Sequence, residues 1–148
     1  YKGIFHSVSA FCNAGFDIIG PESLTPYRGN IAVNITIMTL IIAGGIGFTV
    51  LAEIRGLAAN RKKKSLRTRL YHLSLHAKIA LTVTGVLLMS GTVFFLLLEW
   101  SNSATLGSLP VAEKIVAAAF QSVTLRTAGF NTIDQGGLTE ESQFVSCL

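Results

Sequence analysis

Charged residues are scarce in this chain. Only 14% of the 148 residues are Asp, Glu, Lys or Arg, against about a quarter in ordinary soluble domains. Half are hydrophobic, and residues 29–52 and 79–98 contain no charge at all. At a rise of about 1.5 Å per residue, each stretch can cross a hydrocarbon layer about 30 Å thick. We therefore expect an all-α polytopic membrane protein with two full spans.

Several patterns that would indicate other classes of protein are missing. Cys12 and Cys147 lie near opposite ends, without the spacing of a zinc site or a disulfide framework, and we expect both to pack as small residues among helices. No nucleophile beside a base, phosphate-binding glycine loop or pair of catalytic acids is present. The protein is therefore not expected to be an enzyme.

The two ends of the chain do not have the pattern of a natural start or stop. The sequence begins at Tyr1 without a signal peptide pattern, and it ends at Leu148 where a new apolar run begins. We expect both ends to be cuts through a larger protein.

Most of the positive charge lies between the two apolar stretches. Eight of the twelve Lys and Arg residues are at positions 55, 61, 62, 63, 64, 67, 69 and 78. The positive-inside rule places this connection in the cytoplasm and puts Glu99 and Trp100 at the outer interface. We name its residues 55–76 the basic loop. Its RKKK cluster is interpreted as a topology signal in contact with membrane lipids, and no nucleic-acid partner is expected. For His72 and His76, one helical turn apart, we favour an interfacial helix face over a metal or pH-sensing pair.

Two Ala-Gly-Phe stretches indicate an internal repeat. Residues 13–17 read NAGFD and residues 127–131 read TAGFN; upstream, Phe-His-Ser-Val matches Phe-Gln-Ser-Val when one gap is allowed. After Pro110, a run of helix formers too short to span the membrane is expected to end at residues 122–124. Such a helix enters a membrane as a re-entrant loop. We name residues 13–16 the first glycine segment and residues 127–130 the second glycine segment.

The glycine at the centre of each segment allows backbone conformations that are closed to other residues. Extended backbone of this kind can turn carbonyl oxygens toward one axis, where they replace the hydration shell of a potassium ion. The C-terminal end of a short helix adds partial negative charge. One such segment alone would be interpreted as a loop turn, but two on the same predicted side favour an ion path.

The stretches FHSVSAFCNAGFD and FQSVTLRTAGFNTID resemble the second and third pore loops of the Trk/Ktr/HKT potassium-transporter superfamily, and most of all its KtrB membrane subunits. The resemblance covers essentially the whole chain. It implies four membrane–pore–membrane repeats around one pore, with re-entrant pore loops. Residues 1–54 would be the pore loop and last helix of repeat two, residues 55–76 the cytoplasmic loop, and residues 77–148 the first helix, pore loop and start of the last helix of repeat three.

The resemblance makes Gly15 and Gly129 filter glycines. It implies that K⁺ binds through the backbone carbonyls of Asn13, Ala14, Gly15, Thr127, Ala128 and Gly129. The ion-binding filter backbone as a whole would be Asn13, Ala14, Gly15, Phe16, Thr127, Ala128, Gly129 and Phe130. Filter repeats one and four, and a gating loop beyond Leu148, are expected outside this sequence.

Three polar residues border the predicted filter. Arg126 is expected behind it, bonded to carbonyls or an acid, and bracing is favoured over tuning of ion occupancy. Asp17 and Asn131 are expected to face the outer vestibule; Asp17 either concentrates cations or caps a loop. For Gly44, Gly45 and Gly47 in the first apolar stretch, close helix packing is favoured over a hinge.

By the resemblance, the working unit is a multi-pass homodimer in the inner membrane, with pore loops opening outward. A cytoplasmic nucleotide-binding regulatory subunit of the RCK type would gate it. No covalent cofactor is expected; K⁺ is the transported ion, with Na⁺ as a candidate coupling or activating ion. The alternatives are a secondary transporter with broken helices and a structural membrane subunit without transport.

Overall fold

The computed structural model describes residues 1–20, 23–59 and 73–147, and all regular structure in these ranges is helical. The elements in order are α1 (Lys2–Phe11), η1 (Thr25–Tyr27), α2 (Ile31–Ile46), α3 (Phe48–Ala59), α5 (Leu75–Glu99), α6 (Val111–Thr127), η2 (Gln135–Gly137) and α7 (Glu140–Ser146). The predicted all-α class is therefore confirmed for the described residues.

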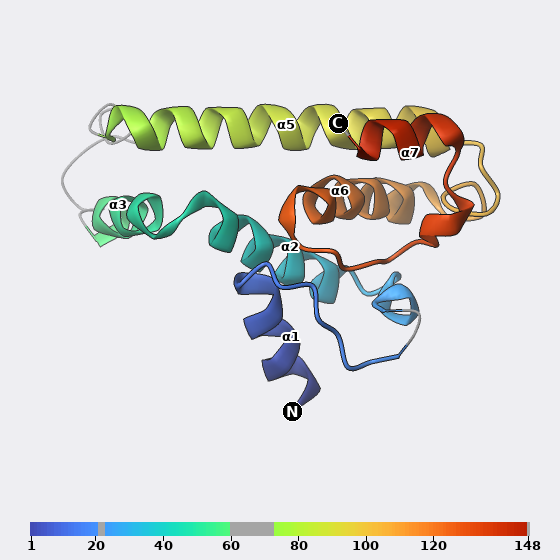
Figure 1. The fold of residues 1–148 in the computed structure, drawn as a ribbon, viewed down its shortest axis with the longest axis horizontal. Helices are drawn as coiled ribbons and strands as arrows, with labels where there is room; N and C mark the ends of the chain where they lie inside the picture. Colours follow the sequence, from blue (N-terminus) through green and yellow to red (C-terminus); the bar gives the residue numbers. More distant parts are fainter. Residues whose placement is uncertain (21–22, 60–72, 148) are drawn as a thin grey trace.

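Helix α5 is the long straight helix of the fold, and α7 lies beside one of its ends (Figure 1). In the described ranges it is the one helix that is long and apolar enough to cross a membrane by itself. It contains the whole second apolar stretch and extends it by a turn at its start. Ser74 caps that start, because its side-chain oxygen accepts a hydrogen bond from the Ala77 N–H.

The first apolar stretch does not form one straight span. It divides into α2 and α3, which meet at Gly47 at an angle of 108°; the pair would make a second span if it is counted as one. Gly47 has φ +94°, and a Cβ placed on it would meet nothing within 4 Å. The prediction of close packing is therefore wrong at Gly47, where the glycine permits the break. It is confirmed at Gly44, where an added Cβ would overlap the Phe11 carbonyl.

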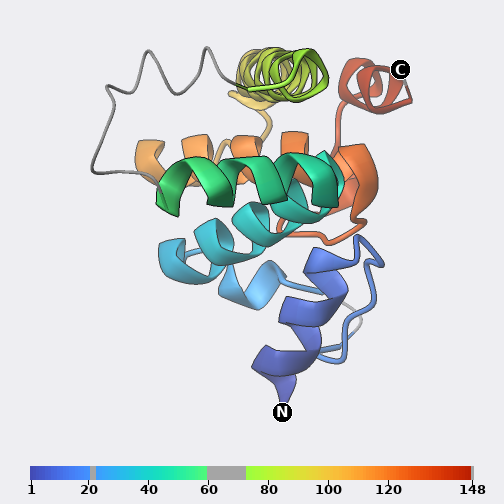
Figure 2. The same ribbon diagram turned by 90° about the vertical axis from the view of Figure 1, so that its left-hand side faces the viewer.

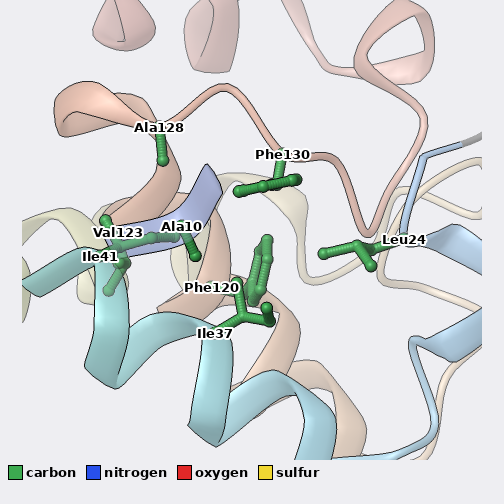
Figure 3. Close-up of a cluster of buried hydrophobic side chains, with 8 residues drawn as sticks. All are labelled: Ala10, Leu24, Ile37, Ile41, Phe120, Val123, Ala128 and Phe130. Atoms are coloured by element: carbon green, nitrogen blue, oxygen red, sulfur yellow. The ribbon is translucent and has the colours of Figure 1, made fainter. Parts of the chain in front are cut away.

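The core lies where α1, α2 and α6 meet, and α6 is packed between α2 and α5 (Figure 2). Phe120 and Val123 of α6 contact Ile37 and Ile41 of α2. The rest of this cluster comes from α1, the loop after it and the second glycine segment (Figure 3); it consists of Ala10, Leu24, Ala128 and Phe130. The second glycine segment thus contributes two side chains to the buried core, whereas no residue of the first glycine segment belongs to it.

Some predicted features lie elsewhere than expected. Residues 60–72, which include most of the basic loop and His72, lie outside the described residues. Residues 55–59 continue α3 as helix, and His76 is exposed on α5. Cys12 and Cys147 are both exposed free thiols, so their predicted packing among helices is wrong.

The C-terminal end of α5 is closed by a buried lysine. Lys114 Nζ donates to the Trp100 carbonyl at 3.0 Å and lies 4.7 Å from the centroid of the Trp100 ring. A cation at a helix C-terminus and above an indole is favourable on both counts. We expect Lys114→Met to lower the free energy of unfolding by about 1 kcal/mol. Thermal unfolding of the full-length protein in detergent measures this, with the exposed Lys2→Met as control; equal midpoints for the two variants would contradict the expectation.

Candidate functional site

The two glycine segments lie against each other. Gly15 and Gly129 have φ of +68° and +78°, a region that favours glycine. A Cβ on Gly15 would overlap the carbonyl oxygen of Ala128 and lie 3.1 Å from its carbonyl carbon. A Cβ on Gly129 would lie 3.9 Å from Gly15 Cα. The fold therefore brings together the two residues that the sequence singled out.

Most carbonyl oxygens of the two segments have no hydrogen-bond donor within the described ranges. Among the residues that the structure describes, none donates to the carbonyls of Asn13, Ala14, Gly15, Thr127, Ala128 and Gly129. Ala14, Thr127 and Gly129 are exposed, so their carbonyls are open to groups from outside the described residues. A cluster of unpaired carbonyls is a site that a cation or water can occupy.

The carbonyls that end the two segments are paired in the same way. Ser9 Oγ donates to the Phe16 carbonyl at 2.7 Å, and Thr124 Oγ1 donates to the Phe130 carbonyl at 2.7 Å. Phe16 is exposed, whereas Phe130 is fully buried in the core. The exit of each segment is thus fixed to the helix that precedes it.

Helix α6 is longer than predicted. It runs to Thr127 instead of ending at residues 122–124, so Thr127 is its last residue and Ala128 its C-cap. The hydroxyls of Ser122 and Thr124 do not compete with the α6 backbone, because they donate outside the helix, to the carbonyls of Leu88 and Phe130. The positive φ of Gly129 then ends the helix.

The side chain of Asn13 connects three parts of the site. With its amide oriented to match the surrounding groups, its nitrogen donates to the Thr127 hydroxyl and the Ile41 carbonyl, both at 3.2 Å. Its oxygen accepts from the Gly45 N–H at 3.1 Å. One amide therefore joins the first glycine segment to the second and to α2, two residues before its break at Gly47.

The loop after the first segment is hydrogen-bonded to the residue that follows the second segment. Asn131 is half-buried; its carbonyl accepts from the Leu24 N–H at 2.9 Å, and its N–H donates to Ser23 Oγ at 3.3 Å. Asp17 is half-buried and has no hydrogen-bond or ionic partner among the described residues. Both follow the segments directly, as predicted, and their vestibule role stays a prediction.

Arg126 does not have the contact that was expected for it. It is exposed on the last turn of α6, and within the described ranges no carbonyl or acid pairs with it. The role of Arg126 in bracing the filter therefore stays a prediction, because no bonding partner for it is found among the described residues.

Sequence reasoning did not identify Ser9, Thr124 or the Asn13 side chain. The alignment of the two copies contained a signal for the first two, because the position after Phe-x-Ser-Val carries a hydroxyl in both. The described residues contain no group of three or more His, Cys, Asp or Glu side chains that could hold a metal. The available ligands at this site are backbone oxygens.

Comparison with known proteins gives a consistent family. The model of the family described as TrkH, cation transport protein, matches residues 1–147. The chain is 43% identical over 140 residues to the Ktr system potassium uptake protein B of Bacillus subtilis, covering 95% of this chain and 29% of that protein. It is 38% identical over 145 residues to the protein of that name from Vibrio alginolyticus, covering 98% of this chain and 30% of that protein.

A third relative carries a different name. The potassium/sodium uptake protein NtpJ of Enterococcus hirae is 44% identical over 131 residues, covering 88% of this chain and 26% of that protein. The chain thus spans less than a third of the length of these curated relatives. All three are named for uptake and none as an enzyme, in agreement with the absence of catalytic patterns. The chain belongs to the TrkH family of cation transport proteins and is part of a membrane protein.

Proposed function

We propose that this chain forms part of a potassium-uptake pathway, in which the two glycine segments supply half of a selectivity filter. The observation that carries the proposal is the contact between the segments at Gly15 and Gly129, with six carbonyl oxygens that have no donor among the described residues. Unpaired carbonyls on converging backbone can replace the hydration shell of K⁺. The remaining filter segments would come from the rest of the longer protein.

Potassium is the proposed ion because the relatives are named for potassium uptake. Two are named potassium uptake proteins and one a potassium/sodium uptake protein. Na⁺ accordingly stays a candidate coupling or activating ion. Asn13 to Gly15 and Thr127 to Gly129 would face the ion, whereas Phe16 and Phe130 would close the filter backbone with their carbonyls turned to the preceding helices.

Assembly and regulation are proposed by the same route. Two relatives are named as proteins of a "Ktr system", and this name supports the proposal that the chain acts together with other components. We propose a homodimer that is gated by a cytoplasmic nucleotide-binding subunit of the RCK type. The basic loop 55–76 is the proposed cytoplasmic contact, and the pore loops would open to the outside.

The break at Gly47 is the one observation that favours a broken-helix secondary transporter instead. Such a transporter binds its ions with helix ends and side chains near the membrane midplane. Residues 29–52, which contain the break, have no charged side chain. The unpaired carbonyls therefore support a filter more strongly than the break at Gly47 supports a broken-helix transporter.

The test is Rb⁺ uptake by the full-length protein in cells that lack other potassium-uptake systems. We expect uptake by the wild type and a loss of about 100-fold in Gly15→Asp and Gly129→Asp, since each puts a side chain on a positive-φ position and a carboxylate beside the proposed ion path. Ser103→Asp adds the same charge to an exposed site in the loop after α5 and serves as the control. Absent wild-type uptake, or full uptake by both glycine variants at normal membrane abundance, would overturn the proposal.

A further inference from the structure

Ser9 and Thr124 hold matching positions in the two copies of the predicted repeat. With one gap, the run FHSVS that ends at Ser9 aligns with the run FQSVT that ends at Thr124. We infer that these two hydroxyls are positioning residues that set the spacing of the filter carbonyls and thereby the preference for K⁺ over Na⁺. The inference rests on the proposed function and assigns its selectivity to two side chains outside the glycine segments.

Each of these residues holds its segment at both ends. At the entry, the Ser9 carbonyl accepts from the Ala14 N–H at 2.9 Å, and the Thr124 carbonyl accepts from the N–H groups of Ala128 and Gly129 at 2.9 and 3.3 Å. At the exit, the same two residues donate their hydroxyls to the phenylalanine carbonyls, both at 2.7 Å. Each filter loop therefore begins and ends on a single residue of the preceding helix.

The burial of the two hydroxyl residues makes these contacts structurally decisive. Ser9 is 6% exposed and Thr124 is 4% exposed, so water has little access to either. The contact of Thr124 with the Phe130 carbonyl is buried, and that of Ser9 with the Phe16 carbonyl is part-buried. A carbonyl away from water that loses its donor must find another partner or stay unpaired at a cost. With the hydroxyl gone, the Phe16 or Phe130 carbonyl is free to turn toward the unpaired carbonyls of its segment.

Rotation of the Phe16 or Phe130 carbonyl toward its segment would change which ion the site binds best. K⁺ and Na⁺ differ in the cavity size and the number of carbonyl oxygens that best replace their water. The hydroxyls keep one carbonyl per segment out of the ion site and fix the ends between which the other carbonyls are spaced. Their removal should therefore alter discrimination between ions more than it alters folding.

The experiment uses the full-length protein and compares Rb⁺ uptake with and without competing Na⁺. Ser9→Ala and Thr124→Val remove the hydroxyls and nearly keep the side-chain volume, whereas Ser9→Thr and Thr124→Ser keep the donors. Ser7→Ala and Thr92→Val are matched controls, because their hydroxyls bond to carbonyls within α1 and α5, at Gly3 and Leu88. We expect about a tenfold loss of Rb⁺-over-Na⁺ discrimination in the two hydroxyl-free variants, at unchanged membrane abundance.

The donor-keeping variants and the controls are expected to retain wild-type discrimination. Wild-type discrimination in Ser9→Ala and Thr124→Val would overturn the inference and leave the proposed function standing. A loss of membrane abundance in these variants, with discrimination per molecule unchanged, would show folding support alone and also overturn it. Absent wild-type uptake would instead overturn the proposed function, and the inference with it.

Discussion

Replacing Gly15 with alanine is expected to abolish Rb⁺ uptake, with a loss of at least about 100-fold, whereas Gly129→Ala keeps a measurable fraction. Both glycines have positive φ, so both variants are strained. Only the Gly15 Cβ meets an obstacle, because it would overlap the carbonyl oxygen of Ala128 in the opposite segment. The Gly129 Cβ would make an ordinary contact of 3.9 Å with Gly15 Cα.

The obstacle at Gly15 is backbone, which cannot rotate away as a flexible side chain can. An alanine there must push the second glycine segment aside, and with it the unpaired carbonyls that we propose to bind the ion. Gly85→Ala is the matched control, since a Cβ on this exposed glycine of α5 meets nothing within 4 Å. Uptake and membrane abundance are measured for all three variants. Equal uptake by the Gly15 and Gly129 variants would contradict the close contact of the two segments.

The sequence was sufficient to predict the features that depend on composition and repetition. Charge-free residues 79–98 predicted α5, because only an apolar helix of that length suits a hydrocarbon layer. The recurrence of Ala-Gly-Phe pointed to Gly15 and Gly129, which the fold brings into contact. Both inferences follow from local patterns that need no knowledge of distant contacts.

The features that depend on tertiary contacts could not be predicted in this way. The break at Gly47 falls in an apolar run as continuous as the one that forms α5. The Asn13 amide reaches the Ile41 carbonyl and the Gly45 N–H, an i, i+4 pair of the α2 backbone. A side chain inserted into the ladder of a helix is a recognised cause of bending, and it comes here from another helix's end. Hydropathy alone carries no sign of it.

Glu99 is the residue whose role changed most between sequence and structure. As a charge after an apolar run, it was interpreted as an interface marker, but it is fully buried. Its carboxylate accepts from the side chains of Asn102 and Thr105 in the loop after α5. It also accepts the N–H and hydroxyl of Thr139, the residue that caps α7, at 2.9 and 2.8 Å. One carboxylate thus joins α5, the loop that follows it and the start of α7.

Glu99→Ala is therefore expected to destabilise the protein by about 3 kcal/mol or more, since four donors lose a charged acceptor in a buried site. Glu99→Gln should retain only part of the stability that Glu99→Ala loses, because the glutamine amide nitrogen is a donor that would face other donors. Thermal unfolding in detergent and membrane abundance of the full-length protein measure the effect. The exposed Glu140→Ala, on α7 itself, is the matched control. If Glu99→Ala unfolds at the same temperature as that control, the buried carboxylate does not hold α7 to α5. In that case apolar packing fixes the path of the chain from the second glycine segment to α7.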